Sequence, residues 1–131
     1  MTKHFTVEHI GLAARDATAL REWYERVLGA ELMWEIAKEP PAALITLGGV
    51  TIEIYSADTS SELMQNNKLA GWRHLALRVD SLDQTRALLE DRGVVFTEPV
   101  KPAGGGGRVL FFRDPEGNLL HLVERLTVGF Q

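Results

Sequence analysis

The 131-residue sequence contains no cysteine, so the chain can form neither a disulfide bond nor a thiolate metal site, and it has no cysteine nucleophile. A chain without cysteine suits a reducing compartment, and we expect a cytoplasmic protein. No apolar run is long enough to cross a membrane, and the N-terminal residues lack the apolar core of a signal peptide. We therefore expect no membrane association.

Positive charge is also scarce. Lys and Arg number 14 against 18 Asp and Glu, which gives a formal net charge of −4, and no basic stripe is present. Nucleic acid is therefore not an expected partner, because binding to its phosphates depends on clustered Lys and Arg. With 45% apolar residues, the chain has enough hydrophobic material for a buried core.

What the sequence does contain is an internal duplication. His9 and His74 each open an apolar, strand-like run, and a helical pattern that ends at a glycine follows each run. The first module is expected to have a helix at 17–28 and strands at 5–13, 31–37, 42–48 and 50–56. The second is expected to have a helix at 82–92 and strands at 72–79, 94–97, 108–113 and 118–126.

These patterns predict an α+β protein with one domain that spans 1–131. Two β-α-β-β-β modules, residues 5–56 and 71–126, are joined by a polar linker at 57–70. The chain length fits a single domain or two small modules that share a core.

Four potential metal ligands occupy matching places in the two modules. His9 and His74 begin the first strand of each module, whereas Glu53 and His121 lie on the last strand of each. Imidazole and carboxylate groups together suit Zn²⁺, Ni²⁺, Co²⁺, Mn²⁺ or Fe²⁺, and the residue types do not choose among these ions. Glu124 is an alternative to His121, but strand alternation directs Glu124 to the opposite face.

Three motifs, in this order along the chain, resemble those of the vicinal oxygen chelate superfamily. That superfamily includes glyoxalase I, methylmalonyl-CoA epimerase, extradiol dioxygenases, and fosfomycin and bleomycin resistance proteins. The motifs are His9-Ile10-Gly11-Leu12, Trp23-Tyr24-Glu25-Arg26-Val27-Leu28-Gly29 and Asp114-Pro115-Glu116-Gly117-Asn118. The resemblance covers residues 5–126. It implies that the two modules pair into an open, barrel-like mixed sheet with the metal inside.

The resemblance also implies a ligand set. The metal-binding positions of the superfamily correspond to His9, Glu53, His74 and His121 in this sequence. The last position, seven residues after the Asp of the turn motif, usually holds Glu and here holds His.

The implied chemistry is chelation of two neighbouring oxygens of a small-molecule substrate and stabilisation of an enolate or enediolate. We therefore expect a metal-dependent lyase or isomerase that resembles lactoylglutathione lyase, with Glu53 as the base that moves a carbon-bound proton. A non-haem iron dioxygenase and a non-catalytic drug-binding protein are the alternatives. The resemblance implies a homodimer, in which the site lies either within one chain or between two.

A glycine-rich segment precedes one of the last strands. Residues 104–107 are all glycine, and Lys101 and Arg108 lie on either side of them. We expect this segment to close over a substrate and to bind its carboxylate or phosphate group through the two cations.

Overall fold

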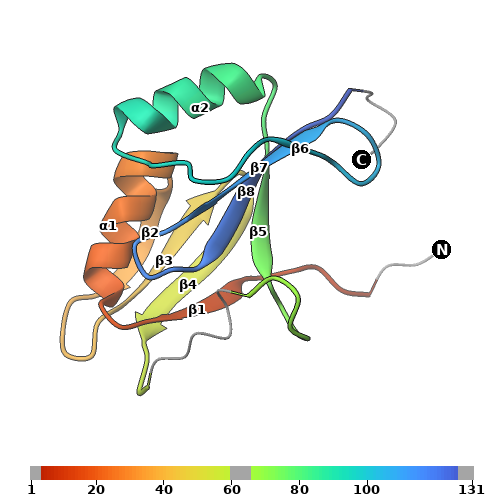
Figure 1. Cartoon of the computed structure of the whole chain (residues 1–131). Coiled ribbons are helices and arrows are strands. Elements are labelled where there is room, and N and C mark those ends of the chain that lie inside the picture. The colour runs from red at the N-terminus through yellow and green to blue at the C-terminus, as the bar shows by residue number, and fades with distance from the viewer. Residues whose placement is uncertain (1–3, 60–65, 127–131) are drawn as a thin grey trace. The chain divides into compact units, whose positions relative to one another are not determined.

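The computed structural model describes residues 4–59 and 66–126, which divide between two compact units, Met1–Ser60 and Ser61–Gln131. No helix among these described residues is long and apolar enough to cross a membrane. The first unit contains β1 (Ile10–Ala14), α1 (Ala17–Leu28), β2 (Glu31–Ile36), β3 (Ala42–Leu47) and β4 (Val50–Ser56) (Figure 1). The second contains β5 (His74–Arg78), α2 (Leu82–Asp91), β6 (Lys101–Pro102), β7 (Arg108–Arg113) and β8 (Leu119–Glu124).

Each unit is a four-stranded mixed sheet with the same topology. The strand orders are β1-β4-β3-β2 and β5-β8-β7-β6. In both sheets the first strand pairs in parallel with the last, and the remaining neighbours are antiparallel. The predicted α+β class and the repeated β-α-β-β-β order are therefore confirmed.

The first helix has the bounds that the sequence predicts. Its N-cap residue, Asp16, accepts a hydrogen bond from the Ala19 backbone amide at 3.0 Å. The buried side chains Leu20, Tyr24 and Val27 are three or four residues apart and form one apolar face, which packs on β3 and β4. The helix ends at Gly29, whose φ of 75° lies in the left-handed region that glycine adopts without strain.

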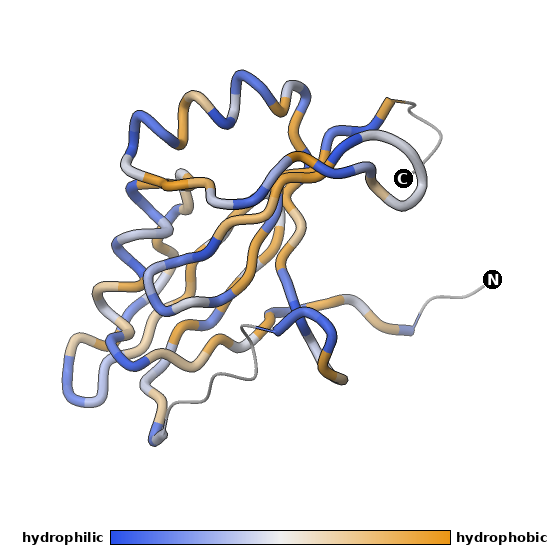
Figure 2. The backbone as a smooth tube through the Cα atoms, viewed as in Figure 1, coloured by the Kyte–Doolittle hydropathy of each residue, from blue (hydrophilic) through white to orange (hydrophobic). Residues whose placement is uncertain are grey.

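The face of each sheet that packs against the helix carries the core of that unit. In the first unit the fully buried side chains include Ile45 and Ile54, and in the second they include Leu110, Leu120 and Leu122. Hydrophobic residues accordingly follow the strands of both sheets (Figure 2). Because successive side chains alternate between faces, Glu53 and His121 point away from their helices.

A turn between β7 and β8 aligns these two strands. The buried carboxylate of Asp114 accepts hydrogen bonds from the backbone amides of Glu116 (2.9 Å) and Asn118 (3.0 Å), and from the Asn118 side-chain amide (2.9 Å). These bonds stabilise the turn that the Asp-Pro-Glu-Gly-Asn motif predicts. The strands that leave the turn pair Phe111 with His121.

Two predicted strands differ from the observed ones. The strand expected at 5–13 begins only at Ile10, and Phe5 and Val7 are 90% and 80% exposed. The parallel partner of Ile10 is Ile52, so residues before β1 run toward the hairpin turn that precedes β4, where no further residues of β4 remain to pair with them. The strand expected at 94–97 is absent, and a two-residue strand occurs at 101–102 instead.

The change at 94–97 follows from the end of α2. The Val94 backbone amide donates to the Leu89 carbonyl at 2.9 Å, and Val94 itself is buried. The Val94 amide therefore forms a hydrogen bond with the C-terminal end of α2 and not with a strand. The chain first pairs with β7 at Lys101.

Candidate metal centre

In the first unit, the structure brings His9 and Glu53 together. The distance from His9 Nε2 to Glu53 Oε1 is 3.9 Å, and the two side chains are 41% and 38% exposed. On the other side of the ring, His9 Nδ1 donates to Glu8 Oε1 at 2.6 Å. This hydrogen bond raises the pKa of His9, and the charges of Glu8 and Glu53 act in the same direction.

In the second unit, the structure brings His74 and His121 together. Their ring centroids lie 4.7 Å apart, and Phe111 lies against both rings at 5.8 and 4.8 Å. His121 is only 7% exposed, and its burial lowers its pKa, so the neutral imidazole is favoured. The neutral form is the one that binds metals.

The three histidines among the candidate ligands use the same ring nitrogen to contact the protein. Nδ1 donates to Glu8 Oε1 in His9, to Asn67 Oδ1 in His74 (2.7 Å) and to the Leu122 carbonyl in His121 (3.2 Å). A neutral imidazole that donates through Nδ1 keeps its lone pair on Nε2. Metal-binding histidines are commonly oriented by such a second hydrogen bond.

The strand register places the two pairs at equivalent positions. Glu53 is the parallel partner of Gly11, and His121 is the parallel partner of Ala76. His9 and His74 lie two residues before these partners. The duplication seen in the sequence is therefore repeated in the hydrogen-bonded register of the sheets.

The spacing within the first pair is somewhat wider than that of two ligands of one tetrahedral ion. Metal–ligand bonds of about 2.0–2.2 Å at tetrahedral angles separate the ligand atoms by about 3.4 Å, and the observed separation is 3.9 Å. Over the two described stretches, no group of three or more His, Cys, Asp or Glu residues is gathered as a metal site. The structure thus presents two pairs of ligand side chains, one in each unit.

Glu124, the alternative ligand, lies on the helix side of the second sheet. Its carboxylate accepts hydrogen bonds from the Leu82 backbone amide at 2.8 Å and from Arg108 Nη2 at 3.0 Å. The amide first and then Arg108 lower the pKa of Glu124. Leu82 is the first residue of α2, so this carboxylate accepts a backbone N–H at the positive end of the helix dipole.

The expectation that Arg108 and the glycine segment act together on a substrate is wrong for Arg108. Its guanidinium binds Glu124 on the helix side. The glycine segment forms a closed turn, in which the Ala103 amide donates to the Gly107 carbonyl at 3.0 Å. Arg125 also donates to the carbonyls of Gly104 and Gly106.

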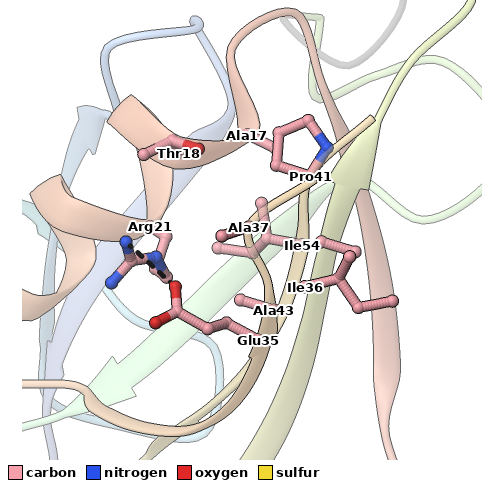
Figure 3. Close-up of a pocket in the computed structure, with 10 residues that line it drawn as sticks. Ala17, Thr18, Arg21, Glu35, Ile36, Ala37, Pro41, Ala43 and Ile54 are labelled. Carbon is pink, nitrogen blue, oxygen red and sulfur yellow. Dashed lines mark ion pairs between the residues drawn. The ribbon is translucent and has the colours of Figure 1, made fainter. Parts of the chain in front are cut away.

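A cavity of about 190 Å³ lies in the first unit, between α1 and the ends of β2 and β3 (Figure 3). Arg21 forms ion pairs there with Glu25 at 3.0 Å and with Glu35 at 3.6 Å. Neither His9 nor Glu53 lines this cavity. It is therefore separate from the first pair of ligand side chains.

Comparison with known proteins identifies the family. Residues 6–122 match the Glyoxalase/Bleomycin resistance protein/Dioxygenase superfamily. The chain belongs to this superfamily. It is 30% identical over 125 residues to the uncharacterized protein YwkD of Bacillus subtilis, with 92% of this chain and 97% of the relative covered. It is 31% identical over 127 residues to the uncharacterized protein YaeR of Escherichia coli, with 91% and 95% covered.

Solved structures show the same fold. A glyoxalase family protein from Enterococcus faecalis has a TM-score of 0.78 at 26% identity, with 92% of this chain and 98% of that chain covered. The fosfomycin resistance protein FosX from Listeria monocytogenes has a TM-score of 0.73 at 21% identity, with 94% and 92% covered. One FosX structure is complexed with Mn(II) and 1S,2S-dihydroxypropylphosphonic acid, so members of the superfamily bind divalent metal and small molecules.

Two residues beside the candidate ligands escaped the sequence reasoning. Phe111 packs on His74 and His121, but its place opposite His121 depends on the register of β7 and β8. Asn67 comes from the polar linker, seven residues before the His74 ring that it contacts. The alternation of β7 could have assigned Phe111 to one face, whereas no pattern marks Asn67.

Proposed function

We propose that this protein is a metal-dependent lyase or isomerase of the glyoxalase type, in which His9, Glu53, His74 and His121 bind one divalent ion. The observation that carries this proposal is the shared orientation of the three histidines. Each donates through Nδ1 to a protein oxygen, which leaves Nε2 as the ligand atom. Zn²⁺, Ni²⁺, Co²⁺, Mn²⁺ and Fe²⁺ all suit this donor set.

The metal, when bound, would polarise two neighbouring substrate oxygens and stabilise negative charge on them. Glu53 is the only carboxylate among the four residues, and its side chain is 38% exposed. It therefore combines a basic oxygen with access for a substrate, and we assign it the transfer of the carbon-bound proton. His9 Nε2 lies 3.9 Å from the Glu53 carboxylate, so the two ligand atoms approach the same point.

Metal analysis followed by an assay with methylglyoxal and a thiol tests the proposal. We expect the purified chain to bind one equivalent of divalent metal, to lose turnover after chelation and to regain it when metal is added. Glu53→Gln should abolish turnover. Glu22→Gln, which makes the same charge change on the exposed side of α1, should not.

Other outcomes identify the alternatives. Full turnover by Glu53→Gln would contradict the role of Glu53. Oxygen uptake with a catechol and Fe²⁺ would instead support a dioxygenase, because two histidines and a carboxylate are the ligands that such iron sites use. Tight binding of a drug without metal or turnover would support a binding protein.

We also propose a homodimer in which each site takes one pair of ligands from each chain. A double variant that lacks His9 and Glu53 is mixed with one that lacks His74 and His121. Sites shared between chains regain metal binding in the mixture, whereas sites within one chain do not. The dimer itself is measured by light scattering, and the cytoplasmic location stays a prediction.

A further inference from the structure

Tyr55 lies on the same sheet face as the first pair of candidate ligands. It follows Glu53 by two residues on β4, and alternation along a strand returns every second side chain to one face. On β1, which lies beside β4 (Figure 1), Gly11 is the parallel partner of Glu53. His9 precedes Gly11 by two residues and meets the Glu53 carboxylate at 3.9 Å. The side chains of His9, Glu53 and Tyr55 therefore project from one face of the first unit.

The ring of Tyr55 leans toward this pair. Its backbone partner on β1 is Ala13, but its ring lies against Gly11, which is two residues closer to His9. A Cβ added at Gly11 would lie 3.3 Å from Tyr55 Cε1 and 3.6 Å from Tyr55 Oη. Because Gly11 pairs with Glu53, the phenol oxygen lies beside the position that carries the carboxylate.

The hydroxyl of Tyr55 is available to a bound molecule. The residues beside Tyr55 on the neighbouring strands are Ala13 and Ala42, whose methyl groups form no hydrogen bonds. In the part of the chain that the structure describes, this hydroxyl has no hydrogen-bond partner. The Tyr55 side chain is 39% exposed. A phenol that is open to solvent and has no protein partner can donate its proton to a ligand oxygen.

The opposite side of Glu53 is apolar along the same row of the sheet. Leu44 on β3 is the partner of Glu53, and Trp34 on β2 is the partner of Leu44. The Trp34 side chain is 48% exposed, so it offers a large apolar surface on this face. The row therefore has a hydrogen-bond donor on its β1 side and an aromatic surface on its β2 side.

We propose that Tyr55 is a substrate-binding residue, whose hydroxyl donates a hydrogen bond to one of the two substrate oxygens that the metal chelates. The inference rests on the proposed function, because it requires a metal at His9 and Glu53. A fixed donor stabilises an oxygen more strongly as negative charge develops on it. The missing side chain at Gly11 makes room for the ring, and Trp34 contacts the carbon part of the substrate.

Binding of a simple chelating anion tests the role of Tyr55. The full chain is loaded with Co²⁺, whose visible absorption reports its ligands, and is titrated with acetohydroxamate, an anion with two neighbouring oxygens. Tyr55→Phe should retain Co²⁺ and bind acetohydroxamate about tenfold more weakly, since one charge-assisted hydrogen bond is lost. Tyr24→Phe, the same change at the other tyrosine of the chain, is buried in α1 and should leave both affinities unchanged.

A second substitution tests the position of the ring. Gly11→Ala places a methyl group 3.3 Å from the Tyr55 ring, which is closer than ordinary van der Waals contact. The phenol should therefore shift, and acetohydroxamate should bind several-fold more weakly. If this loss acts through the hydroxyl, the double variant Gly11→Ala/Tyr55→Phe should bind no more weakly than Tyr55→Phe. Fully additive losses would contradict the contact between Gly11 and the phenol.

Two results would overturn the role of Tyr55. One is equal acetohydroxamate affinity in Tyr55→Phe and the unaltered chain when both hold Co²⁺. The other is loss of Co²⁺ from folded Tyr55→Phe, which would make the residue part of the metal site and not a substrate contact. An unaltered chain that binds no Co²⁺ refutes the proposed function and the role of Tyr55 with it, so the metal content distinguishes the two failures.

Discussion

His121 and Glu124 lie three residues apart on β8 and face opposite sides of the second sheet. His121 packs on His74 and Phe111, while the Glu124 carboxylate accepts the Leu82 amide at the start of α2. Both residues have side chains that bind metals, but alternation along the strand separates them. Only His121 shares a face with another candidate ligand.

Replacing Glu124 is expected to weaken the fold and leave metal binding intact. Glu124→Gln removes the charge that binds the Leu82 amide and Arg108, so we expect Tm to fall by a few degrees. Metal content, measured on the same preparation, should equal that of the unaltered chain. Loss of the metal in a folded Glu124→Gln protein would make Glu124 a ligand after all.

The stabilisation by Glu124 should depend on pH. Its pKa in the folded protein lies below the ordinary value of 4.5, so the folded state favours the ionised carboxylate. The contribution is therefore present above pH 4.5 and is lost as the pH falls through the lowered pKa. Denaturation with urea should show a gap between the unaltered chain and Glu124→Gln at pH 7 that narrows toward pH 3.

His121 should produce a pH dependence at higher pH. Burial lowers its pKa below 6.5 in the folded state, so the unfolded chain takes up a proton first as the pH falls through 6.5. The contribution of His121 to the free energy of unfolding of the metal-free protein should therefore decrease between pH 7.5 and 5.5, opposite in sign to that of His9, whose pKa is raised.

Two variants test this assignment in the same urea denaturation series. His121→Asn should reduce the slope with pH, while His4→Asn, at an exposed position near the N-terminus, should not. An unchanged slope in His121→Asn would show that another group titrates.

The glycine segment provides a matched pair of substitutions. A Cβ at Gly107 would lie 1.9 Å from the Glu124 carbonyl oxygen, and Gly107 has a φ of +103°. Gly107→Ala should therefore lower the free energy of unfolding by at least about 2 kcal/mol. A Cβ at Gly104 meets nothing within 4 Å, so Gly104→Ala should be tolerated. Equal thermal denaturation of the two variants would contradict the close approach of Gly107 to β8.

Adjacent residues on β4 should separate stability from function. Ile54 is fully buried on the helix side, and Ile54→Ala should lower the free energy of unfolding by about 2–5 kcal/mol. Glu53 faces away from the helix and is partly exposed, so Glu53→Gln should change it by less than about 0.5 kcal/mol in the metal-free protein. Chemical denaturation measures both. A large loss of stability in Glu53→Gln would assign the carboxylate a structural role.

Local features of the sequence predict the helices and most strands well. The bounds of α1 follow from Asp16, the spacing of Leu20, Tyr24 and Val27, and Gly29, all of which lie within a few turns of one another. Helix caps and helical periodicity depend on residues three or four positions apart, so a short stretch of sequence is enough to predict where a helix begins and ends. The strand expected at 94–97 failed because its first amide, Val94, finds a helical carbonyl instead.

The sequence alone determined the duplicated modules and the alternation that places Glu53 opposite Ile54 and His121 opposite Glu124. Only the tertiary structure decided which groups meet: Asn67 with His74, Phe111 with His121, and Arg108 with Glu124. The reason is physical. Alternation is a property of one strand. Contacts between side chains of different strands depend on the register between those strands and on the path of the linker. Both are selected by the pairing of backbone groups that lie far apart in the chain.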